Sequence, residues 1–196
     1  EGKSLLDVLD KTETAMGGRL LRRWLSFPLL DLDVIHRRQG IVGALVKEHE
    51  LRRTFGELLR GIGDLERLSS KVAVGRISPR EMRQLALSLR QAEMLVGLTA
   101  GATVPELASY ATNYTSCTEI VEELEHTLTE EPPAVLGRGQ TIAQGIDAEL
   151  DELRRLSSHG KEYLLELQRR ESERTGITSL KVAFNNVFGY YVEVRS

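Results

Sequence analysis

The chain has 196 residues, 41% hydrophobic and 28% charged, which is typical of a folded globular protein rather than a disordered one. Its formal net charge of −3 argues against nucleic-acid binding over the whole surface, because attraction to phosphates requires clustered Lys and Arg. Any contact with DNA must therefore be local.

The chain shows no sign of membrane insertion or export. No apolar run approaches the roughly 20 residues of a membrane span, and no secretory signal is visible. Cys117 is the only cysteine, so no intrachain disulfide is possible and a reducing cytoplasm is the expected location. The first residues, EGKSLLDVLD, lack Met and indicate a fragment of a longer protein.

After a short helix near Ser4–Leu9, the stretch from Thr12 to Pro28 predicts a buried helix that packs against other helices. Thr12 or Thr14 can cap its start, and Pro28 marks its end. Gly17 and Gly18 indicate either a break or the close approach of another backbone. The apolar face has helical spacing and comprises Met16, Leu20, Leu21, Trp24 and Phe27.

Three arginines, Arg19, Arg22 and Arg23, lie between these apolar residues. One interpretation is a solvated helix flank. The alternative is a contact with phosphate or carboxylate groups.

Helical patterns continue through the middle of the chain. Asp31 or Asp33 can cap the next helix, and two shorter helices are expected at 51–59 and 65–74, separated by Gly61 and Gly63. Ser78, followed by Pro79 and Glu81, predicts a capping box that opens a helix reaching about Leu98. Further helical sequence follows Pro105 and ends in an acidic stretch at 119–128.

The pattern changes after a glycine-containing loop at 136–145. A long polar helix with a thin apolar seam is expected from Asp147 to about Arg174, and this pattern suits an arm better than a globular core. The pairs Asp151 with Arg155 and Glu166 with Arg170 have the spacing of helix-stabilising ion pairs. Gly176 provides the stop.

The last residues change to a period of two, which predicts a β-hairpin with Asn185 and Asn186 at its turn. A lone hairpin is marginally stable in water. Because the sequence stops at Ser196 as the second strand ends, we expect the parent protein to continue and to pack beside it.

The predicted fold class is mainly α: a multi-helical core at 1–146 and, at 147–196, a long helical arm ending in a small β-hairpin. No phosphate-binding loop, zinc-ligand spacing or nucleophile motif is present in the sequence. We therefore expect no catalytic residue, metal site or cofactor in this chain.

Two long segments, TETAMGGRLLRRWLSFPLLDLDVIHRR with GIGDLERLSSKVAVGRISPREMRQL, and ELDELRRLSSHGKEYLLELQRRESERTGITSLKVAFNNVFGYYVEV, resemble the bacterial MutS mismatch-repair family. They are similar to its helical core, or lever, and to the start of its clamp. The resemblance implies a parent that recognises mismatched double-stranded DNA, acts as a homodimer encircling DNA, and works with a MutL-type partner. ATP and Mg²⁺ would be bound elsewhere in the parent.

The same resemblance places candidate contacts to the DNA backbone at the end of the arm: Lys181, Asn185, Asn186 and Arg174. Each has a simpler interpretation. The two asparagines can serve only to form the turn, and Lys181 can be an ordinary solvent-facing strand residue. A different class of function, a helical protein-interaction scaffold with no DNA role, is the alternative.

Overall fold

The computed structural model describes residues 2–102, 105–185, 187 and 189–194. They form two compact units, Glu1–Ala143 and Gln144–Ser196, which are described separately. The chain is mainly helical with one small antiparallel sheet, so the predicted fold class is confirmed. The helices of the first unit are α1 (Leu5–Leu9), α2 (Ala15–Ser26), α3 (Leu32–Lys47), α4 (His49–Gly61), α5 (Leu65–Ala73), α6 (Pro79–Ala100), α7 (Pro105–Thr112) and α8 (Thr118–Thr127). No helix in the described ranges is both long and apolar enough to cross a membrane.

The helices of the first unit begin at the predicted caps. Thr14, rather than Thr12, caps α2 by accepting a hydrogen bond from the Gly17 N–H at 3.0 Å. Asp31 caps α3 in the same way. The predicted capping box of α6 is present, because Ser78 and Glu81 bond reciprocally to each other's backbone N–H groups.

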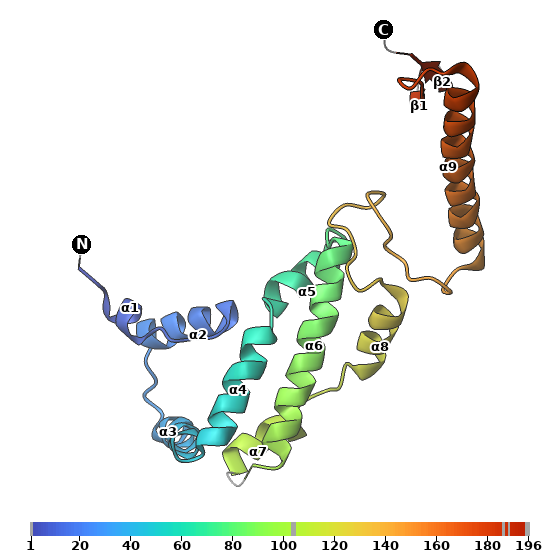
Figure 1. Ribbon diagram of the computed structural model, residues 1–196. Helices are drawn as coiled ribbons and strands as arrows, with labels where there is room; N and C mark the ends of the chain where they lie inside the picture. Colours follow the sequence, from blue (N-terminus) through green and yellow to red (C-terminus); the bar gives the residue numbers. More distant parts are fainter. Residues whose placement is uncertain (1, 103–104, 186, 188, 195–196) are drawn as a thin grey trace. The chain divides into compact units, whose positions relative to one another are not determined.

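Helix α6 is the centre of the first unit. It contacts α4 and α5 on one side and α7 and α8 on the other (Figure 1). Apolar side chains from α5, α6, α7 and α8 and the residue after α8 are buried: Leu68, Leu85, Ala86, Leu107, Val121 and Leu128. The core therefore forms around α6.

The two glycines between α4 and α5 lie against α6. The fully buried Ser88 hydroxyl accepts a hydrogen bond from the Gly63 N–H at 3.0 Å. A Cβ atom at Gly63 would lie 3.2 Å from the Ser88 Oγ atom, and one at Gly61 would lie 3.3 Å from Gln91. These positions therefore break the chain, as predicted, and also let the connection approach α6 closely.

Helix α8 receives its start from a neighbouring helix. Its N-cap residue, Cys117, makes no side-chain cap bond. Instead the Glu93 carboxylate of α6 accepts hydrogen bonds from the Cys117 N–H, the Ser116 hydroxyl and the Thr118 hydroxyl. After α8, Leu128 forms an antiparallel bridge with Ile142, which the sequence patterns did not predict.

The prediction that the helix at Thr12–Pro28 is buried is wrong for this chain. No residue of α2 is buried, and Leu20 and Trp24 remain 46% and 41% exposed. Gly17 and Gly18 do not break the helix. Cβ atoms added at Gly17 and Gly18 would lie 3.1–3.4 Å from side chains of Asp10, Thr12 and Thr14, because the segment before the helix folds back over its first turn.

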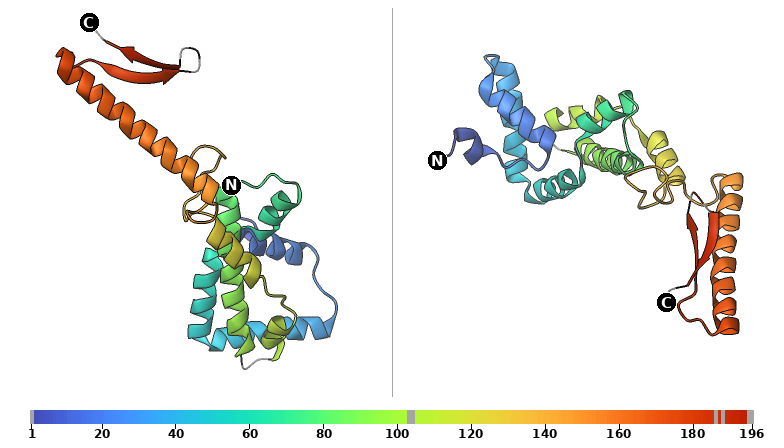
Figure 2. Two further views of the ribbon diagram at one scale, coloured as in Figure 1. Left: turned by 90° about the vertical axis from the view of Figure 1, so that its right-hand side faces the viewer. Right: turned by 90° about the horizontal axis from the view of Figure 1, so that it is seen from above.

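The second unit consists of α9 (Ala148–Thr175) and a hairpin of β1 (Lys181–Asn185) and β2 (Gly189–Glu193) that follows the C-terminal end of α9 (Figure 2). Asp147 caps α9, and Gly176 ends it with a φ of +71°. Both features were predicted. The expected side-chain pairs are wrong: Arg155 pairs with Glu152, Asp151 with Arg154 at 3.3 Å, and Arg170 with Glu171 at 3.5 Å. Neighbours at shorter spacing compete successfully because the side chains are long and flexible.

Candidate nucleic-acid interface

The connection between α9 and β1 positions the candidate DNA contacts. Gly176 adopts the left-handed conformation that glycine tolerates, and the Ser172 hydroxyl donates to the Ile177 carbonyl at 2.8 Å. Gln168 Oε1 then accepts a hydrogen bond from the Val182 N–H at 2.9 Å. Leu180 is buried just before the strand begins. These contacts hold the start of β1 against the last turns of α9.

Lys181 is the first residue of β1, and its side chain is exposed. The strand register places Glu193 directly opposite Lys181. Lys181 and Asn185 lie on the same face of β1, about 13 Å apart along the strand. Lys181 can therefore reach a phosphate, although a carboxylate is its cross-strand neighbour.

Arg174 is 70% exposed in the last turn of α9. Its Nε atom donates to Glu171 Oε2 at 2.7 Å, and Arg170 lies 3.5 Å from Glu171 Oε1. The Arg174 hydrogen bond is the main cause that lowers the pKa of Glu171. Exposed pairs of this kind contribute little stability, so a phosphate can replace the carboxylate at small cost.

Asn185 performs the turn role. Its Oδ1 atom accepts a hydrogen bond from the Val187 N–H at 3.0 Å, an Asx turn that closes the hairpin. Asn186 lies outside the described residues. On the opposite sheet face the rings of Phe184 and Tyr190 pack with centroids 5.0 Å apart. Turn formation and aromatic packing therefore explain this end of the hairpin without a ligand.

The structure adds two cations that sequence reasoning did not propose as contacts. Arg169 and Arg170 are 77% and 66% exposed beside Arg174. Residues 168–181 carry four basic side chains against two acidic ones, in a chain whose net charge is −3. This local excess of positive charge could have been read from the sequence by counting charges in short windows.

The arrangement supplies hydrogen-bond donors and positive charge, which are the groups that hold phosphates without reading bases. Within the described ranges, no three His, Cys, Asp or Glu residues are grouped so that they could hold a metal ion. The chemistry at this end of α9 is therefore electrostatic binding.

The arginines of α2 belong to a different set of contacts. Arg19 donates to both carboxylate oxygens of Asp64, at 2.7 and 2.8 Å, and to Glu66 of α5 at 2.6 Å. The Arg19 hydrogen bonds are the main cause that lowers the pKa of Asp64 to about 2. Of the two interpretations of these arginines, the carboxylate contact is therefore confirmed at Arg19. It links α2 to α5 rather than to a ligand.

The fold and these contacts define a mainly helical module with a long helical arm. The sequence profile of MutS domain III matches residues 1–179. The chain is 47% identical over 196 residues to the DNA mismatch repair protein MutS of Parabacteroides distasonis and 49% identical over 195 residues to that of Porphyromonas gingivalis. All of this chain is covered in both comparisons, and 22% of each relative.

This chain therefore belongs to the MutS DNA mismatch repair family and contains its domain III. It spans about a fifth of the length of the relatives that it matches.

Proposed function

We propose that the chain is the lever and the first part of the clamp of a mismatch-recognition ATPase. In this proposal, the first unit transmits changes between the ATPase and the arm, and the end of α9 with its hairpin contacts the DNA backbone. The observation that supports it most directly is the domain III match over residues 1–179, with exposed cations gathered at 168–181.

The parent protein would act as a homodimer that encircles mismatched double-stranded DNA and recruits a MutL-type partner. ATP and Mg²⁺ would bind to a part of the parent outside this chain. The domain division at 146/147 is part of the same proposal. The two compact units meet between Ala143 and Gln144, close to that boundary.

Backbone contacts of this kind have a defined physical signature. Each phosphate neutralised by Lys or Arg releases condensed counterions, so the affinity falls as salt rises, with a logarithmic slope of about −0.9 per contact. Such contacts do not distinguish bases. The arm would therefore strengthen binding to matched and mismatched duplexes equally.

The test is duplex binding by the full-length protein carrying Arg174→Ala and Lys181→Ala together. We expect the affinity at low salt to fall about tenfold or more, and the salt slope to decrease by about 1 for each phosphate that the variant no longer neutralises. Discrimination between matched and mismatched duplexes should not change. Fluorescence anisotropy over a salt series measures all three quantities.

Arg155→Ala is the matched control, because Arg155 is an exposed arginine of α9 distant from the hairpin. A second variant adding Asn185→Ala and Asn186→Ala tests the turn residues. If the double variant and Arg155→Ala bind equally well at low salt, the proposed tip contacts are wrong. A scaffold without a DNA role then becomes the better explanation of the fragment.

A further inference from the structure

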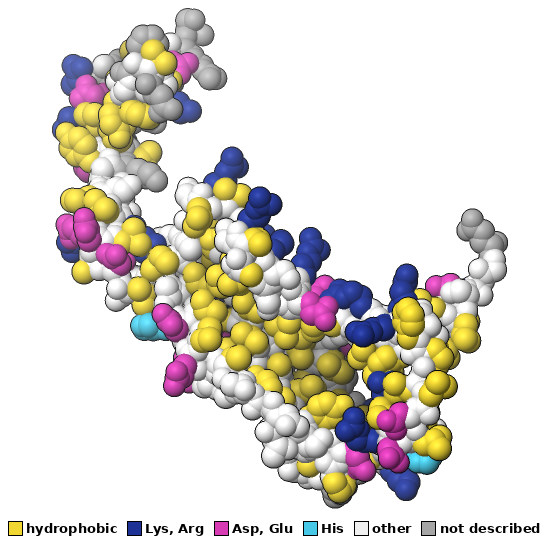
Figure 3. Space-filling model, turned by 180° about the vertical axis from the view of Figure 1, so that it is seen from behind, with side chains coloured by type: hydrophobic (Ala, Val, Ile, Leu, Met, Phe, Trp, Pro, Cys, Tyr) yellow, Lys and Arg dark blue, Asp and Glu magenta, His cyan; other side chains and the backbone are white. Residues whose placement is uncertain are grey.

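Helices α2 and α3 leave large apolar side chains exposed. Phe27 is 75% exposed, Leu30 is 93% exposed and Val42 is 61% exposed. Hydrophobic side chains also reach the surface over much of the face of this unit seen in Figure 3. Contiguous apolar surface of this kind marks an interaction site in a folded protein.

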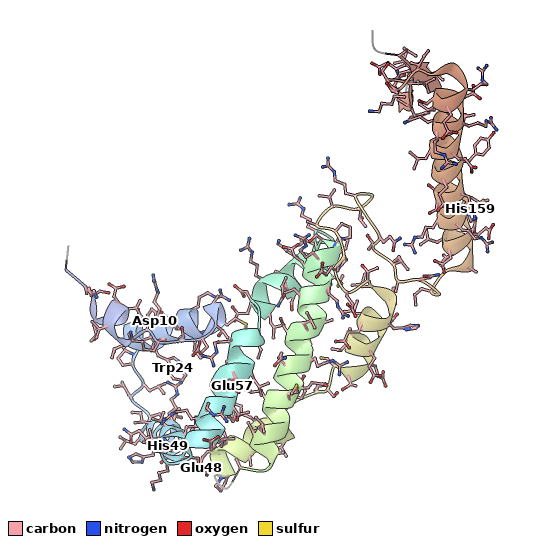
Figure 4. The ribbon with its side chains drawn as sticks, viewed as in Figure 1. Asp10, Trp24, Glu48, His49, Glu57 and His159 are labelled. Atoms are coloured by element: carbon pink, nitrogen blue, oxygen red, sulfur yellow. The ribbon has the colours of Figure 1, made fainter. Side chains whose placement is uncertain are left out.

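Part of this surface is a groove of about 590 Å³ between the end of α2 and α3. Trp24, Ile35 and Val42 supply apolar walls, and Arg38 lies at its edge. The Arg38 guanidinium carbon is 3.6 Å from the centre of the Trp24 ring, on the side of α2 that faces α3 (Figure 4). This cation–π contact holds the two walls together.

Two glycines of α3 have no role inside the unit. Gly43 lines the groove, and a Cβ atom added at Gly40 or Gly43 would meet no atom within 4 Å. A glycine inside a helix costs about 1 kcal/mol relative to alanine. The close approach of another backbone to α3 would offset that cost.

The surroundings of the groove are basic. Residues 15–47 carry six Lys and Arg against two Asp, whereas the whole chain is net negative. Arg22, Arg23 and Arg37 are exposed, and none of them forms an ion pair with any residue that the structure describes. An occupant with negative charge along its flank would complement this rim.

We propose that the groove receives an acidic amphipathic helix from another part of the same polypeptide. The relatives are long enough to provide it, since the matched segment covers 22% of their length. Apolar residues of that helix would fill the groove beside Gly43, and its carboxylates would face Arg37 and its neighbours. The inference goes beyond the proposed function and does not depend on the arm contacting DNA.

Two other occupants fit less well. A nucleic acid backbone would leave the apolar walls uncovered, because phosphates pair only with the basic rim. A second copy of this chain could offer its acidic helix α8. However, the apolar side of α8 already packs against α6, and Val121 is 1% exposed there.

The experiment measures thiol labelling of Val42→Cys in the full-length protein, in a background without other reactive cysteines. Ile120→Cys on α8 is the matched control, because Val42 and Ile120 are 61% and 57% exposed in this chain. We expect Val42→Cys to react at least tenfold more slowly than Ile120→Cys, independently of protein concentration. Gly43→Cys repeats the measurement if Val42→Cys fails to fold.

Two further changes test the chemistry of the occupant. Gly43→Leu should raise the Val42→Cys labelling rate toward the control rate, whereas Gly97→Leu, at an open glycine of α6, should not. Arg37→Glu should also raise it, and Arg67→Glu on α5 should not.

Equal labelling of Val42→Cys and Ile120→Cys would show an open groove and overturn the proposal. Protection that appears only at high concentration, or only after another protein is added, would contradict an occupant from the same polypeptide. If Gly43→Leu releases the groove and Arg37→Glu does not, the occupant is apolar but not acidic. The labelling rates do not depend on DNA affinity, so failure here is independent of the arm.

Discussion

Asp64 serves two helices with one carboxylate. It caps α5 by accepting from the Arg67 N–H at 3.2 Å, and it pairs with Arg19 of α2. Glu81 is similar, because it completes the capping box of α6 and pairs with Lys71 of α5. The Lys71 hydrogen bond is the main cause that lowers the pKa of Glu81 to about 2, followed by the bonds to Ser78. Single acidic residues therefore join neighbouring elements of this unit.

These two carboxylates predict how stability depends on pH. Their ordinary pKa values are 3.8 for Asp64 and 4.5 for Glu81, and both fall to about 2 in the folded chain. A lowered folded pKa means that the contribution is fully present above the unfolded pKa and is lost as pH falls through the folded one. We expect progressive destabilisation from about pH 4.5 to 2, measured by urea unfolding at each pH. Glu81→Gln should flatten this dependence more than Glu123→Gln, an exposed carboxylate of α8. An equal effect of both would contradict the assignment.

At the scale of elements, α9 is stabilised mainly by its ends. Asp147 caps the start, Gly176 closes the end, and the ion pairs along its surface are exposed and join close neighbours. Such pairs contribute about 0.3–0.5 kcal/mol each at most. The direction of the hairpin therefore depends on Gly176 and on the Gln168 contact more than on the charges of the helix.

Two glycines of α9 predict opposite outcomes for the same substitution. Gly160 lies inside the helix with open space around it, so Gly160→Ala should stabilise the helix by about 1 kcal/mol. Gly176 has a φ of +71°, so Gly176→Ala should destabilise the unit by about 1–2 kcal/mol. Circular dichroism during thermal unfolding measures both changes. Stabilisation by Gly176→Ala would show that α9 ends differently.

At the scale of the whole molecule, the chain consists of two compact units, each with its own contacts. The loop before the boundary contains Gly137 and Gly139, both with positive φ, and Arg138 is exposed between them. The proposed lever and clamp roles require that these units can be distinguished physically.

Limited proteolysis tests that division. Exposed loops are cut before helices, so trypsin should cleave after Arg138 before it cleaves at Arg154 or Arg155 inside α9. Mass spectrometry of the first products would identify the site, and Arg138→Gln should remove that cut. Earlier cleavage within α9 would show that the arm is less ordered than its caps indicate.

The sequence by itself determined the helix starts, the glycine stop after α9, the hairpin and the family. These depend on caps, backbone preferences and apolar periods, which act over a few neighbouring residues. The tertiary structure alone decided the partners of the long charged side chains. Arg19 pairs with residues 45 and 47 positions away, and no local pattern indicates that choice.

The tertiary structure also decided which apolar faces are covered. Helix α2 has the apolar period of a buried helix, yet all its residues retain solvent exposure in this chain. Periodicity shows that a helix has an apolar face, but burial depends on what packs there. At the end of the arm, the sequence placed Lys181 and Arg174 in one region, and the structure determined that Asn185 closes the turn. The physical reason is the same: turns and caps are local, whereas the choice of partner depends on how distant segments meet.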